Sequence, residues 1–163
     1  MGGDQAGTRP RKLVRPLLDA AVALPQELPF KLYVFYYLYL IALDHGQIGD
    51  AARYLHAYRE RIELMPEAFQ GSVWLESAFF AAAYQHDRPA AEAFRALAKP
   101  SPPTPADVPA RADAALARLV GNADLAFAKA QLGLQELPKS LDRGSACLYA
   151  EWLRDTVHWA EQH

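Results

Sequence analysis

Helix-forming residues dominate this chain and narrow the choice of fold more than any other feature of the sequence. There are 31 alanines and 22 leucines, against 3 isoleucines, 7 valines and 3 threonines. Alanine and leucine favour helices, whereas β-branched residues favour strands. With 163 residues, of which 52% are hydrophobic, the chain is long enough for one compact domain. The composition therefore predicts an all-α protein.

Prolines divide the chain into predicted helices, because proline is tolerated in the first turn of a helix and disrupts its interior. Seven helices are expected, at about residues 30–44, 50–64, 67–85, 89–98, 107–120, 122–137 and 140–161. Residues 1–15 are predicted to be a flexible leader, and a short helix at 16–24 precedes the seven. Residues 16–163 are expected to form a single domain, in which the proline-rich stretch 99–106 is a stiff, extended loop.

An internal period runs through these helices. A turn residue stands five positions before an alanine in three places, and a second column of alanines lies nine positions before the first. The two columns are Ala51, Ala91 and Ala126, and Ala42, Ala82 and Ala117. Small residues at matching positions let paired helices approach closely, as stacked helical hairpins require. The pattern favours a repeat-like stack, with an irregular helical bundle as the alternative.

At these residues the chain resembles the tetratricopeptide repeat (TPR): a turn glycine such as Gly46, an alanine five residues on, and Pro138 closing the third unit. The resemblance covers about residues 30–138. It implies antiparallel helical hairpins stacked as a short, right-handed α-solenoid. The chain departs from the repeat where Tyr39, Phe79 and Ala114 occupy the column that usually holds glycine in the first helix.

A second resemblance rests on residues 47–55, 74–83, 111–115 and 151–153. These segments are similar to the soluble helical-repeat region that follows the membrane helices in some bacterial site-2-protease-like zinc metalloproteases. The catalytic part of that family needs a His-Glu-x-x-His motif, which this sequence lacks. The resemblance therefore implies a non-catalytic appendage or a stand-alone relative.

Charge and cysteine content restrict the partners and the compartment. A net charge of −2 provides no domain-wide basic field, so nucleic acid is not an expected partner. The single Cys147 excludes an intrachain disulfide and fits a reducing compartment, so a cytoplasmic location is expected. The uncharged run Leu32–Leu43 has twelve residues, whereas a membrane span needs about 20. The helix at 30–44 is therefore expected to be buried or to mediate homo-oligomerisation.

No catalytic or metal-binding constellation is visible in the sequence. The five histidines include no pair spaced three or four residues apart, so no helix face offers two imidazoles to a metal. His45 and His86 fall at predicted turns, and Cys147 is expected to fill space in the core. There is no glycine-rich phosphate loop and no nucleophile elbow. Neither enzymatic activity nor a cofactor is therefore expected.

The repeat register predicts a concave groove for a partner. Its residues are predicted to be Tyr33, Tyr36, Asp44, Glu76, Phe80, Arg111 and Arg118. Tyrosines offer a large contact area and arginines grip carboxylates, so the groove suits a peptide. The predicted function is thus a protein-protein interaction or regulatory module. The alternative to the groove is that Tyr33, Tyr36 and Phe80 simply belong to the core. The alternative function is a small-molecule-binding or enzyme domain with an apolar pocket beneath the helix at 30–44.

Overall fold

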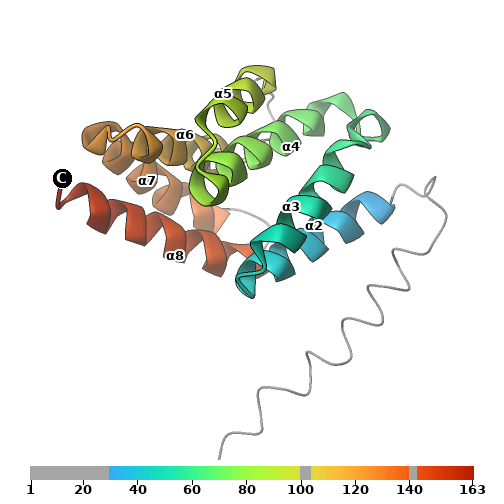
Figure 1. Cartoon of the computed structure of the whole chain (residues 1–163), viewed down its shortest axis with the longest axis horizontal. Coiled ribbons are helices and arrows are strands. Elements are labelled where there is room, and N and C mark those ends of the chain that lie inside the picture. The colour runs from blue at the N-terminus through green and yellow to red at the C-terminus, as the bar shows by residue number, and fades with distance from the viewer. Residues whose placement is uncertain (1–29, 100–103, 140–142) are drawn as a thin grey trace, which may run out of the picture. The chain divides into compact units, whose positions relative to one another are not determined.

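The computed structural model describes residues 30–99, 104–139 and 143–163 (Figure 1). These residues form helices and turns, and no strand occurs among them, so the prediction of an all-α protein is confirmed. The described α-helices are α2 (Phe30–Asp44), α3 (Ile48–Arg59), α4 (Glu67–Phe80), α5 (Arg88–Leu97), α6 (Asp107–Leu119), α7 (Ala123–Glu136) and α8 (Arg143–Ala160). The leader at 1–15 and the helix predicted at 16–24 lie outside the described residues.

Three short helical segments adjoin these helices. They are the 3-10 turn η1 (Ile62–Leu64), the π-helical turn η2 (Ala81–Gln85) and the 3-10 turn η3 (Leu137–Lys139). The structure therefore ends α4 five residues earlier than the predicted helix at 67–85 and continues it as a π-helix. No helix in the described part of the chain is long and apolar enough to cross a membrane.

The chain divides into two compact units, one ending at Arg61 and the other beginning at Ile62. In the first unit α2 packs against α3, and the rings of Tyr36 and Tyr58 lie 5.6 Å apart. The helix α2 is apolar around most of its circumference, but Tyr33 and Tyr37 remain 59% and 50% exposed. The described part of the first unit is thus a pair of packed helices with two exposed tyrosines on α2.

The second unit is organised around α6, which contacts α4, α5, α7 and α8. Five alanines of α6 are buried, which lets several helices approach its backbone closely: Ala110, Ala112, Ala114, Ala115 and Ala117. Leu153 of α8 is fully buried against Ala114 and Ala130. Gly133 of α7 permits this packing, because a Cβ atom there would lie 3.1 Å from the methyl groups of Leu153.

All six alanines of the two sequence columns are buried, each at most 3% exposed. They lie in the contacting pairs α2 and α3, α4 with η2 and α5, and α6 and α7. The alanine pattern therefore marks positions where consecutive helices pack closely.

The turns between these paired helices share a left-handed residue. Gly46, His86 and Gly121 have φ angles of 67°, 54° and 74°. Glycine adopts this region without strain, whereas a side chain disfavours it. His86 is the exception among the three turns.

The first and third turns close with the same hydrogen bond. The N–H of Gln47 donates to the carbonyl of Ala42, and the N–H of Asn122 donates to that of Ala117. Both bonds span five residues and follow the Schellman pattern of helix C-termini. In the second turn the N–H of Asp87 reaches one residue further back, to Ala81. The π-helical turn η2 thus holds one more residue than an α-helical end would.

Candidate functional site

The groove residues predicted in the first unit lie on α2. Tyr33 and Asp44 are exposed, while Tyr36 is half-buried and packs against Tyr58. The alternative view of the tyrosines as core therefore does not describe Tyr33.

The groove residues predicted in the second unit fall into two environments. Glu76, Phe80 and Arg111 are buried, with exposed fractions of 3–4%. Arg118 is partly exposed and lines a pocket. The structure thus brings Glu76 and Arg111 together inside the unit and leaves Arg118 accessible.

Arg111 is the centre of a buried polar cluster. Its Nη1 donates to Oε2 of Glu76 at 3.3 Å, and its Nε lies 3.5 Å from Oδ2 of Asp107. The hydroxyl of Tyr149 donates to Oε1 of Glu76 at 2.8 Å. The Arg111 guanidinium also lies over the Tyr149 ring, 3.4 Å from its centroid. The cluster joins α4, α6 and α8 through one cation and two carboxylates.

Burial governs the charge of this cluster. It raises the pKa of Asp107, and the positive charge of Arg111 opposes that rise. Both carboxylates are at most 4% exposed, and so is the guanidinium between them. Buried charges need such partners because desolvation is costly. The arrangement joins the helices internally and presents little surface to a partner.

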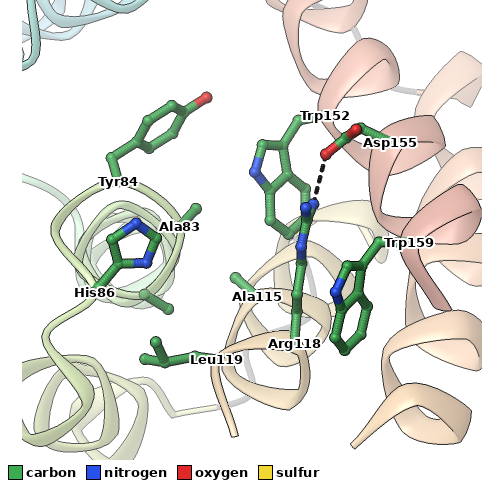
Figure 2. A pocket seen from close by; sticks show the side chains of 10 residues that line it. Ala83, Tyr84, His86, Ala115, Arg118, Leu119, Trp152, Asp155 and Trp159 are labelled. Carbon is green, nitrogen blue, oxygen red and sulfur yellow. Dashed lines mark hydrogen bonds and ion pairs between the residues drawn. The ribbon is translucent and has the colours of Figure 1, made fainter. Parts of the chain in front are cut away.

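A pocket of about 460 Å³ opens between η2, α6 and α8 (Figure 2). Its walls combine aromatic, small and charged side chains. They are Ala82, Ala83, Tyr84, His86, Ala115, Arg118, Leu119, Trp152, Asp155 and Trp159. Three segments far apart in the chain therefore meet at this pocket.

Arg118 is held in a fixed orientation at the pocket. Its Nη1 donates to Oδ2 of Asp155 at 2.6 Å and to the hydroxyl of Thr156 at 3.1 Å. That hydroxyl donates in turn to the carbonyl of Trp152 at 3.0 Å. The guanidinium carbon lies 5.5 Å from the centroid of the Trp159 ring, within the range of a cation–π interaction. Figure 2 shows Arg118 extended between the two tryptophans.

The opposite wall comes from η2 and the residue that follows it. The ring of Tyr84 lies 5.8 Å from that of Phe79 and 5.7 Å from that of Phe80, and burial raises its pKa to about 12. Tyr84 is therefore a neutral hydroxyl at physiological pH. His86 adopts a left-handed backbone conformation that side chains disfavour. Both π-helical turns and strained residues recur at functional sites.

The histidines and the cysteine were the candidates for metal binding and catalysis in the sequence. No group of three or more His, Cys, Asp or Glu side chains in the described part of the chain could hold a metal ion. Cys147 is exposed, so the expectation that it fills space in the core is wrong. His45, His56 and His86 are exposed as well. The pocket is equipped for hydrogen bonding, ion pairing and aromatic contact.

The sequence predicts Arg118 as a groove residue but does not predict the α8 residues that surround it. One face of α8 carries Trp152 and the residues three, four and seven positions after it, which are Asp155, Thr156 and Trp159. That spacing was the available signal. Tyr84 had no such signal, because its position depends on η2.

Comparison with known proteins gives no relative. No protein-family model matches the chain, and neither a curated protein nor a solved structure matches it significantly.

Proposed function

We propose that this chain is a non-catalytic interaction module that binds a peptide segment of a partner protein at the pocket between η2, α6 and α8. The observation that carries the proposal is the position of Arg118, fixed by Thr156 between Trp152 and Trp159 at an open pocket. An oriented guanidinium with tryptophans beside it is the composition of a protein-recognition hot spot.

The helical hairpins support a repeat-like arrangement. Buried alanines occur at all six column positions, and three turns share a left-handed residue. Both features suit the TPR-like stack of antiparallel hairpins, and we propose this architecture as a short α-solenoid. A relation to the helical-repeat region of site-2-protease-like metalloproteases is part of the same proposal, as is a cytoplasmic location.

A second candidate function is the binding of a small molecule. A volume of about 460 Å³ lies within the usual range for small-molecule sites, and two indole rings line it. This pocket belongs to the second unit, whereas the sequence predicted one beneath the helix at 30–44. A stoichiometric small molecule released from the purified chain in native mass spectrometry would favour this candidate over peptide binding.

The proposed function is tested by selecting, from a library of displayed peptides, those that bind the full chain. Selected peptides should bind the unmodified chain in fluorescence anisotropy, and Arg118→Gln should weaken binding at least about tenfold. Arg154→Gln is the matched control, because Arg154 is an exposed arginine of α8 that does not line the pocket. It should leave the affinity within about twofold.

Two results would contradict the proposed function. If selected peptides bind the Arg118→Gln chain as tightly as the unmodified chain, the pocket is not the binding site. If no peptide is selected in repeated rounds with a folded chain, peptide binding itself is refuted.

A further inference from the structure

The pocket holds more hydrogen-bond donors than acceptors. Arg118 uses only Nη1 in its hydrogen bonds, so Nε and Nη2 have no hydrogen-bond acceptor in the described part of the chain. The indole N–H groups of Trp152 and Trp159 likewise donate to no described residue. Figure 2 shows the nitrogen of Trp152 on the side of its ring that faces Tyr84 and His86. A ligand that accepts several hydrogen bonds would match this set.

Of the two acceptors that Arg118 donates to, one is a carboxylate. Asp155 receives the 2.6 Å hydrogen bond from Nη1, yet its side chain is 63% exposed. The chain thus pairs its own aspartate with the arginine that lines the pocket. This pair shows that the Arg118 guanidinium donates to a carboxylate at this position.

We propose that the pocket recognises the side-chain carboxylate of an acidic residue flanked by aromatic residues in the partner, and that this carboxylate replaces Asp155 on Arg118. The inference rests on the proposed function and specifies its ligand. An aspartate or glutamate side chain is the source we infer, because Asp155 is itself such a side chain.

The exchange is physically reasonable because the resident pair is weakly held. Ion pairs with a largely exposed member contribute little, owing to hydration and screening. Arg118 itself stays in place, since Thr156 is fully buried and fixes Nη1 independently of Asp155. A planar carboxylate can then take two parallel hydrogen bonds from the guanidinium, a geometry that lysine could not offer.

Aromatic neighbours give the incoming carboxylate its advantage over Asp155. The pocket walls include Tyr84, Leu119, Trp152 and Trp159, and these apolar surfaces lie beside Arg118. Asp155 does not cover them, since the pocket is open. A partner residue that stacks on an indole while its neighbour binds Arg118 would gain contacts that Asp155 cannot make.

Blocked tripeptides test the inference without a known partner. Acetyl-Phe-Glu-Phe-amide is titrated into the full ¹⁵N-labelled chain to millimolar concentration, beside its glutamine counterpart. The indole N–H signals of Trp152 and Trp159 should shift with the glutamate peptide and much less with glutamine. Trp74 is the internal reference, because its ring stacks on Phe94 away from the pocket.

Two substitutions sharpen the test. Arg118→Gln should reduce the affinity for the glutamate peptide at least about tenfold. Asp155→Asn removes the competing charge at nearly constant size, so it should raise that affinity about two- to fivefold. A merely structural role of Asp155 would give the opposite sign. The ¹H–¹⁵N spectrum of each free variant verifies that it is folded.

Three results would overturn the inference. They are equal affinity for the glutamate and glutamine peptides, weaker binding by Asp155→Asn, and shifts confined to Trp74. Acetyl-Phe-Gln-Phe with a free C-terminal carboxylate could instead bind more tightly than acetyl-Phe-Glu-Phe-amide, which would show that the pocket takes the carboxylate of a chain end. Tighter binding of phenylacetate than of acetyl-Phe-Glu-Phe-amide would show that the ligand is a small acid.

The peptide selection separates this failure from failure of the proposed function. Selected peptides that depend on Arg118 but lack acidic residues would uphold the proposed function and refute the carboxylate ligand. If neither the selected peptides nor the glutamate peptide binds at the pocket, both the proposed function and the carboxylate ligand are refuted.

Discussion

Removal of Arg111 should destabilise the second unit more than any other single charge change in its core. The variant Arg111→Met keeps an apolar stem of similar length but leaves Glu76 and Asp107 without their shared cation. Both carboxylates are at most 4% exposed, so water cannot replace the guanidinium. Breaking a buried ion pair in this way costs about 3–5 kcal/mol, and the presence of two carboxylates favours the upper part of that range. Domains of this size are stable by only about 5–15 kcal/mol.

Urea unfolding followed by tryptophan emission measures this effect selectively. All three tryptophans of the chain, at positions 74, 152 and 159, belong to the second unit. The midpoint for Arg111→Met should fall strongly at neutral pH, and the deficit should shrink in acid as protons neutralise the two carboxyl groups. Arg154→Met, which removes an exposed arginine, is the control and should change stability by less than about 0.5 kcal/mol.

A charge-balanced variant distinguishes electrostatics from lost packing. Combining Arg111→Met with Glu76→Gln and Asp107→Asn removes the charges while an amide oxygen still accepts the hydrogen bond of Tyr149. Much of the cost of removing one partner of a buried ion pair comes from the uncompensated charge that remains, and the combined variant leaves no such charge. At least half of the loss should therefore be recovered. A loss below about 1 kcal/mol for Arg111→Met, or no recovery in the combined variant, would refute the reasoning.

Four further predictions concern the same unit. Burial raises the pKa of Asp107 above 3.8, so the folded state binds this proton more tightly than the unfolded state does. The free energy of unfolding therefore falls as the pH rises through the pKa of Asp107, and Asp107→Asn should flatten the pH profile measured by urea unfolding. Leu153→Ala removes a fully buried side chain and should cost about 2–5 kcal/mol in the same assay, with unchanged stability refuting the described packing. Gly71→Ala places a Cβ 2.9 Å from the Lys99 carbonyl, so backbone must shift and the melting temperature should fall. Asn122→Ala deletes the side-chain cap of α7 and should cost about 1 kcal/mol, whereas Asn122→Ser should retain most of it.

Local sequence signals were enough to predict most helix positions. The predicted helix at 30–44 coincides with α2. The helix predicted at 89–98 is displaced from α5 by one residue at each end, and the one at 107–120 ends one residue later than α6. The alanine columns also identified positions that are buried. Proline, turn glycine and small residues act within a few positions of themselves, so their consequences are visible in a single stretch of sequence.

The site depends mainly on contacts between residues that lie far apart in the sequence. Glu76 is 35 residues from Arg111 and 73 from Tyr149, so their cluster arises only after α4, α6 and α8 pack together. Asp107 lies four residues before Arg111 on α6, so that pair is visible in the helix spacing. Its burial is not, because arginines are mostly exposed. Arg118 and Asp155 are likewise 37 residues apart.

The pocket arises where one hairpin departs from the other two. The turns after α2 and α6 close with five-residue hydrogen bonds and a left-handed glycine. The turn after α4 holds one extra residue in η2 and places His86 where the others have glycine.

These departures have a local energetic cost, because π-helical geometry and a left-handed histidine are both disfavoured. They also supply one wall of the pocket, including Ala83, Tyr84 and His86, opposite Arg118 and the tryptophans of α8 (Figure 2). A regular α-helical end would shorten that wall by one residue and turn Tyr84 by about 100° around the helix axis. Deletion of Ala83 with His86→Gly should therefore stabilise the turn while weakening any ligand of Arg118, and a variant that kept full affinity would show that the irregular turn has no part in binding.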